Sequence, residues 1–131
     1  MKGAVAIRNL LLASSDVTDI LGTGENMRVY PSKAPKGADN PCVTLYFDNN
    51  GLRSKSALVA HDTSCILNIF TDENKYDQAL DLSQKIKDAL DKQSSSVIKD
   101  IQYNGCETSY DHESESHQIT QKYRLWQNES L

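Results

Sequence analysis

The segment from Thr63 to Asp91 constrains the fold more than any other part of this chain. Its first part, Cys65 to Phe70, is short and largely apolar on both faces, which is typical of a β-strand covered on two sides. After a polar turn, a stripe recurs at helical spacing with charged residues between its members. The stripe consists of Tyr76, Ala79, Leu80, Leu82, Ser83, Ile86, Ala89 and Leu90. The segment therefore predicts a strand and then an amphipathic helix that lies on a sheet.

The polar turn has the composition of a helix start. Thr71, Asp72, Glu73 and Asn74 offer side-chain oxygens to the first free N–H groups and place negative charge at the positive end of the helix dipole. The choice of N-cap among the four stays open. Within the helix we expect the leucines at positions 80, 82 and 90 and Ile86 to be buried, each stabilising the fold by about 1.5–3 kcal/mol.

Length and composition indicate one globular domain, which we place at residues 1–131. The chain of 131 residues is 38% hydrophobic and 24% charged, and no run approaches the ~20 apolar residues of a membrane span. The first fifteen residues resemble a weak secretory signal, but Arg8 and Asn9 interrupt the apolar run too early. We therefore expect a helix at the N-terminus and no membrane partner.

Charge and cysteine content exclude further classes. The net charge of −4 and the pI near 5.3 argue against nucleic-acid binding through the phosphate backbone, which normally shows a basic face. We therefore expect no sequence-specific nucleic-acid partner. Cys42, Cys65 and Cys106 are spread singly, so we expect reduced thiols that pack as small apolar groups.

The rest of the chain predicts short helices at the N-terminus and strands elsewhere. A helical stripe begins at Ala4, and a second short helix ends at Gly22. Further strands are expected over residues 27–30, 42–48, 97–103 and 117–127, with a turn at Asn50-Gly51 and the last two strands in a hairpin. The fold class is α+β, with a mixed, mostly antiparallel sheet of about five to six strands against two or three helices. The element order is roughly α-β-β-β-α-β-β, and the strands that flank the central helix are expected to be parallel.

The residues that suggest chemistry do not form a convincing site. His112 and His117 lie among Asp111, Glu113 and Glu115, which are ligand types for zinc or manganese. Their five-residue spacing would put the two histidines on opposite faces of a strand, so we interpret this stretch as a solvated hairpin tip.

A nucleophilic pair is no better supported. His61 and Asp62 precede Ser64 and Cys65, but a strand should direct the thiol of Cys65 into the core. Gly22 and Gly24 lack the third glycine of a dinucleotide-binding turn. We therefore expect no catalytic, cofactor-binding or metal-binding residues and no enzyme activity.

Several patches together resemble the tail completion family of long-tailed bacteriophages and prophages, which includes tail terminator and head–tail joining proteins. The patches are LLLASSDVTDILG at residues 10–22, RVYPSKAP at 28–35, NPCVTLYF at 40–47, the segment 65–91, and YRLWQ at 123–127. The resemblance covers almost the whole chain, and its motifs are fold-forming rather than chemical. It implies a noncatalytic structural subunit that forms a ring, commonly a hexamer, at the end of the tail tube. Its partners would be itself, the tail tube protein and the head connector, in the virion tail and, during assembly, in the host cytoplasm.

The polar loops are the expected contact surfaces, because loops on a rigid sheet commonly carry binding sites. These loops are residues 31–41, 49–62 and the acidic tip 111–116. We single out Arg53 and Lys55 as a basic pair for the acidic residues Asp111, Glu113 and Glu115 of a neighbouring subunit; solvated loop charges are the plainer alternative. A second function class is a small cytoplasmic α+β binding or enzyme domain unrelated to virions. That class predicts a concave pocket with perturbed histidine or carboxylate groups.

Overall fold

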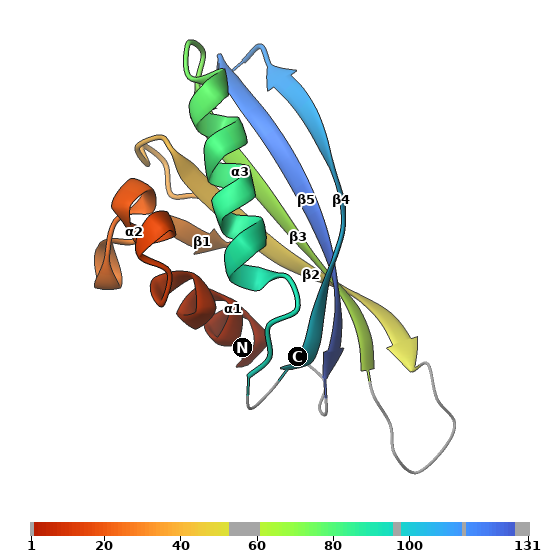
Figure 1. Ribbon diagram of the computed structural model, residues 1–131. Coiled ribbons are helices and arrows are strands. Elements are labelled where there is room, and N and C mark those ends of the chain that lie inside the picture. The colour runs from red at the N-terminus through yellow and green to blue at the C-terminus, as the bar shows by residue number, and fades with distance from the viewer. Residues whose placement is uncertain (1, 53–60, 96–97, 114, 128–131) are drawn as a thin grey trace.

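The computed structural model describes residues 2–52, 61–95, 98–113 and 115–127, which form helices and strands in the order expected from the sequence (Figure 1). The helices are α1 (Lys2–Leu12), α2 (Ser15–Leu21) and α3 (Tyr76–Leu90), with a single 3-10 turn, η1, at Gly24–Asn26. The strands are β1 (Val29–Pro31), β2 (Cys42–Leu52), β3 (His61–Asp72), β4 (Ile98–Asp111) and β5 (Ser116–Gln127). The α+β class is confirmed.

The described strands form one sheet in the order β1-β2-β3-β5-β4. β1 runs parallel to β2, and all other neighbouring strands are antiparallel. Because β3 and β4 both pair antiparallel with β5, they run in the same direction, and α3 connects them across that strand. The expected parallel direction of the strands that flank α3 and the expected hairpin of the last two strands are both confirmed.

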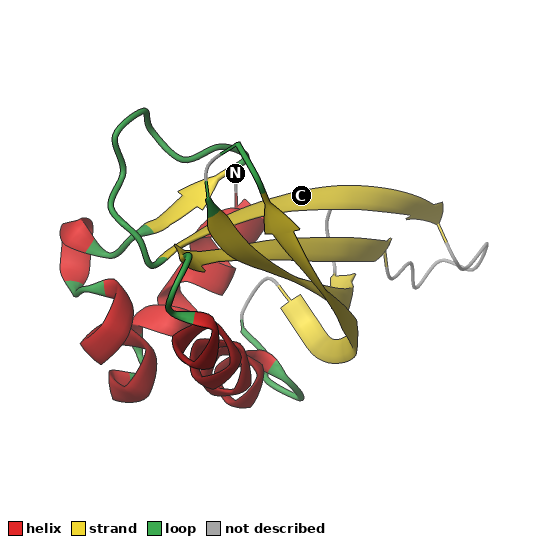
Figure 2. Cartoon of the chain, turned by 90° about the horizontal axis from the view of Figure 1, so that it is seen from above, coloured by secondary structure: helices red, strands yellow, loops and turns green. Residues whose placement is uncertain are grey.

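The helices lie on one face of the sheet, and α3 crosses its middle (Figures 1 and 2). Alternate strand residues point toward the helices, because successive side chains of a strand face opposite sides. The buried strand residues include Val43, Leu45, Cys65, Leu67, Ile69, Ile119 and Leu125, and the helices add Ile7, Leu11, Leu82, Ile86 and Leu90. The prediction that β3 is covered on both sides holds for only one face, since Ile66 and Phe70 on the other face are half-buried.

The buried stripe of α3 is narrower than the sequence predicted. Ala79, Leu82 and Ile86 are fully buried, but Leu80 is 45% exposed, so its predicted burial is wrong. Each helical residue is rotated by about 100° from the last, which turns Leu80 roughly 200° from Leu82. The predicted side-chain cap is also wrong, because the N-cap position is Lys75 and no side chain caps this end.

Two strands extend further toward their C-terminal ends than the sequence predicted. β2 runs on through the Asn50-Gly51 pair to Leu52, so the hairpin turn is not at that pair. β4 extends to Asp111, beyond a register shift between Tyr103 and Cys106 that contains Gly105 at φ 113. The extension was missed because Cys106, Glu107, Thr108 and Ser109 are exposed on both faces and show no apolar alternation.

Candidate assembly surfaces

The face of the sheet opposite the helices is a mixed polar and apolar surface. Tyr46, 41% exposed, lies in register with the half-buried Ile66. Beside them, the Asn68 Oδ1 atom accepts hydrogen bonds from Thr120 Oγ1 over 2.8 Å and from Gln118 Nε2 over 3.1 Å. These hydrogen bonds hold the side chains in place on an open face of the sheet, which suits contact with another protein better than enclosure of a small ligand.

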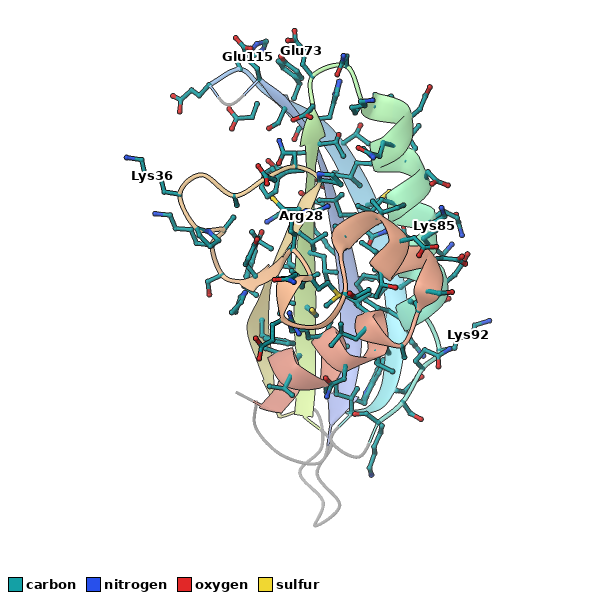
Figure 3. All side chains as sticks on the ribbon, turned by 90° about the vertical axis from the view of Figure 1, so that its left-hand side faces the viewer. Arg28, Lys36, Glu73, Lys85, Lys92 and Glu115 are labelled. Carbon is teal, nitrogen blue, oxygen red and sulfur yellow. The ribbon has the colours of Figure 1, made fainter. Side chains whose placement is uncertain are left out.

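The second surface is the acidic tip, which we define as residues 111–116 at the β4–β5 turn. Asp111 accepts a hydrogen bond from the backbone N–H of Glu113 over 3.0 Å, while the side chains of Glu113 and Glu115 are exposed. The register of β3 with β5 brings Asp72 beside Ser116, so Asp72 and Glu73 lie at the same end of the sheet. Figure 3 shows Glu73 and Glu115 there. The tip therefore concentrates negative charge at one end of the molecule.

An aromatic cluster supports the acidic tip. The ring of Tyr110 lies 4.9 Å from that of His112 and 5.2 Å from that of His117, between centroids. His117 also packs against Tyr76 at 5.0 Å, and its Nε2 atom lies 2.7 Å from the carbonyl oxygen of Glu73. The interpretation of this stretch as a hairpin tip is confirmed, because His112 lies in the turn between β4 and β5 and His117 is the second residue of β5. Within the ranges given above, no three histidine, cysteine or carboxylate side chains are arranged to hold a metal ion.

Two of the three cysteines are buried in the core, and the third is exposed on the surface. Cys65 is fully buried, and burial raises the pKa of its thiol. Burial also raises the pKa of Cys42, against a smaller opposing effect of Arg28. Cys106 is exposed. A raised pKa disfavours the nucleophilic thiolate at Cys65, and the side chains of His61 and Asp62 lie outside the described residues.

The predicted basic pair cannot be placed directly. Arg53 and Lys55 lie outside the described residues, between the ends of β2 and β3. Leu52 pairs with His61 at the start of β3, whereas the acidic tip adjoins the other end of that strand at Asp72. The strand has 12 residues and so spans about 36 Å. The pairing of Arg53 and Lys55 with the acidic tip of a neighbouring subunit therefore stays a prediction.

The loop between β1 and β2 carries charges that the sequence reasoning did not single out. Lys33 and Lys36 are both exposed, as expected for this proline-containing loop. The loop is fixed at one end by a hydrogen bond from the Ser32 N–H to the Leu45 carbonyl over 2.7 Å. At the other end Arg28 Nε donates to the Pro41 carbonyl over 2.8 Å, and Asn40 Nδ2 donates to Asp72 Oδ1 over 3.1 Å. The lysines flank Pro35 in the sequence SKAPKG, and these two basic residues beside a proline were the sequence signal that could have identified an exposed basic loop.

The alternative of a small binding or enzyme domain predicts a concave pocket. A shallow groove lies between the α1–α2 junction and α3. It is lined by Leu10, Ala13, Ser14, Asp16, Lys85, Asp88, Ala89 and Gln93, with no histidine or cysteine among these described residues. The hydrogen bond that Lys85 donates to the Asp81 carboxylate is the main cause that raises the pKa of Lys85. A raised pKa favours the protonated amine, which is a poor general base.

Comparison with known sequences identifies the family. The sequence profile described as tail completion protein gp17 matches residues 5–128. This chain belongs to the tail completion protein gp17 family. The assignment confirms the resemblance stated above, makes the chain a structural protein of phage tails, and favours that role over an unrelated enzyme domain. No curated protein sequence matches the chain.

A solved structure shares the fold. It is titled "Virion of native gene transfer agent (GTA) particle" and superposes with a TM-score of 0.81 over 96% of this chain and 94% of the other, at 16% sequence identity. At that identity the likeness shows the fold alone. Among the described helices, none has the length and apolar character needed to cross a membrane.

Proposed function

We propose that this tail completion protein is a noncatalytic subunit of a ring, a hexamer in the virion, that terminates the tail tube and joins it to the head connector. The observation that carries the proposal is the family match over residues 5–128, which spans nearly the whole domain. The fold shared with a chain of a virion particle supports a place in the assembled tail.

The partners follow from that position. The subunit contacts copies of itself, the tail tube protein and the head connector proteins, in the virion tail and, during assembly, in the host cytoplasm. No cofactor and no membrane take part. The broad helix-free face of the sheet and the loops at its ends offer surface for such contacts.

The charges of the chain suggest one contact between subunits. Arg53 and Lys55 of one subunit would face Asp111, Glu113 and Glu115 of another. Reversal of both basic residues to glutamate should then weaken self-association and leave the monomer folded, and an unchanged association would remove this contact.

The net charge of −4 has a role in the same proposal. A passage through which DNA slides must not bind the phosphate backbone, and an acidic inner surface would repel it. A charge map of the assembled ring tests this point, and a basic lumen would count against it.

Deletion of the gene from its phage or prophage tests the proposed function. Without a terminating ring, we expect tail tubes of irregular length that are not joined to filled heads, seen by negative-stain electron microscopy. Complementation with the wild-type gene should restore joined particles. Joined particles with tails of normal length in the deletion strain would overturn the proposal.

A further inference from the structure

The helix-free face of the sheet carries apolar side chains near its centre. Ile66 in β3 points away from the helices and is half-buried, and Tyr46 in β2, its register partner, is 41% exposed. When one face of an antiparallel sheet is in water, its side chains are commonly polar. The apolar pair therefore indicates that another surface covers this part of the sheet.

Basic side chains lie beside this apolar pair. Lys122 in β5 is the register partner of Ile66, and its Nζ atom makes only a long contact of 3.8 Å with the Glu107 carboxylate at the surface. Arg124, two residues further along the same face, lies over the ring of Trp126 at 5.1 Å. Tyrosine and arginine are enriched in protein interfaces, so the composition suits contact with a partner. We call this surface the open-face patch and define it as Tyr46, Ile66, Lys122 and Arg124.

The outer side of α3 presents the complementary combination of an apolar side chain with acidic neighbours. Leu80 is 45% exposed, and Asp77 and Asp81 lie next to it on the same side of the helix. Asp81 is exposed and accepts a hydrogen bond from Lys85 Nζ over 2.9 Å, whereas Asp77 is exposed and forms no ion pair with a described residue. We call this surface the α3 outer stripe and define it as Asp77, Leu80 and Asp81.

The open-face patch and the α3 outer stripe lie on opposite sides of the domain. α3 packs on the sheet through Leu82 and Ile86, which are fully buried, so its outer stripe faces away from the sheet. Figure 2 shows the helices on one face of the sheet, and the patch belongs to the other face. The sheet and α3 itself therefore separate the two surfaces, and a contact between them needs two copies. Such a heterologous contact repeats from copy to copy and can close into a ring.

We propose that the α3 outer stripe of one copy docks on the open-face patch of the next copy. Leu80 then covers Tyr46 and Ile66, while the two aspartates of the stripe face the two cations of the patch. Opposite charges around matching apolar centres identify the occupant as another copy of this chain. The inference rests on the ring formation proposed above and names its lateral contact.

The same contact accounts for two features that a single copy leaves unexplained. The sequence pattern predicts that Leu80 is buried and that β3 is covered on both faces, but one copy exposes Leu80 and covers only one face of the strand. Docking of the stripe on the patch buries Leu80 and supplies the second cover of β3. Burial of this apolar surface in the assembly favours association.

A mixing experiment with purified protein tests the contact. The stripe variant Asp77→Lys/Leu80→Lys and the patch variant Tyr46→Ser/Lys122→Ser should each weaken self-association at least about tenfold in analytical ultracentrifugation. Because each variant keeps the surface that the other lacks, an equimolar mixture should form heterodimers and nothing larger. A mixture that stays monomeric, although both variants melt cooperatively by circular dichroism, would show that the two surfaces do not bind each other.

The variant Val5→Lys/Glu25→Lys is the matched control for the stripe variant. It makes the same change of net charge and also replaces an exposed apolar residue, since Val5 on α1 is 56% exposed and Glu25 in η1 is exposed. This variant should associate as wild type does. Equal weakening in the control would show that net charge, and not the proposed contact, governs association.

Carbodiimide cross-linking provides a direct readout of proximity. In assembled mixtures of light and heavy-isotope copies, mass spectrometry should find mixed-isotope links between Lys122 and Asp77 or Asp81, and isolated tails should contain the same links. If wild type assembles while the variants are without effect and these links are missing, or if Lys122 is linked only to another tail protein, the lateral contact is wrong and ring formation stands. If wild type shows no self-association at any concentration or in tails, the ring and the contact both fall.

Discussion

The side-chain amide of Gln121, at the centre of the sheet, donates to both the carbonyl and the hydroxyl oxygen of Ser83 on α3, each over 2.8 Å. Gln121 is fully buried, and its Oε1 atom accepts a hydrogen bond from the Tyr123 hydroxyl over 2.9 Å. A satisfied polar network in an apolar layer fixes one position of the helix over the sheet.

Replacement of Gln121 by alanine should lower the free energy of unfolding by about 2–4 kcal/mol, because it leaves the Tyr123 hydroxyl without its acceptor and opens a cavity. Gln84→Ala is the matched control, since this exposed glutamine bonds only to Asp88 on the helix surface, over 2.9 Å. Its effect should stay within about 0.5 kcal/mol. Urea unfolding measures both, and equal losses would contradict the assigned role of Gln121.

The side chains of Ile86 and Leu80 give a second prediction on the same helix. Ile86→Asp places a carboxylate in the fully buried layer and should prevent soluble folding. Leu80→Asp makes a similar change at a site that is 45% exposed and should give soluble protein with a normal melting transition. Expression yield and circular dichroism decide the matter, and a soluble, cooperatively melting Ile86→Asp protein would refute the packing of α3.

Stability should decline at alkaline pH. Burial raises the pKa of Cys65, Cys42 and Tyr123 in the folded protein, so above the unfolded-state pKa values the folded state binds more protons. The stabilisation is complete below about pH 8.5 and is lost as the pH rises, first through the thiols and from about pH 10 through the tyrosine.

Chemical denaturation between pH 7 and 10.5 checks this order. The Cys42→Ala/Cys65→Ala variant should delay the decline until about pH 10, whereas Cys106→Ala removes an exposed thiol and should leave the onset unchanged. A decline in the double variant that begins at the wild-type pH would show that the buried thiols are not responsible.

Sequence periodicity predicted the elements of this fold where packing imposes a pattern. The spacing of Leu67 and Ile69 is that of a half-buried strand, and the spacing of Leu82 and Ile86 is that of an amphipathic helix. The structure buries all four side chains. Prediction failed at the far end of β4, where Thr108 and Ser109 are exposed on both faces and leave no pattern. It failed at Leu80 because hydrophobicity alone does not distinguish a core position from the helix flank.

The assembly surfaces were less predictable than the fold. The acidic tip is visible in sequence as Glu113 and Glu115 near a turn, but its position beside the 32–41 loop depends on the pairing of Asp72 with Ser116 and on the hydrogen bond from Asn40 to Asp72. Strand order is set by long-range pairing that local patterns do not encode. Arg53 and Lys55 attract attention as basic residues in an acidic chain, but they lie outside the described residues, so their pairing with the tip stays a prediction.

The most direct test of the central claim is the position of this protein in the virion. A tagged copy that supports particle assembly can be located by gold labelling and electron microscopy, or by cryo-electron microscopy of intact particles. We predict a single ring at the head-proximal end of the tail tube, between tube and connector. Its absence from purified particles, or its location along the tube or at the distal end, would contradict the proposed function.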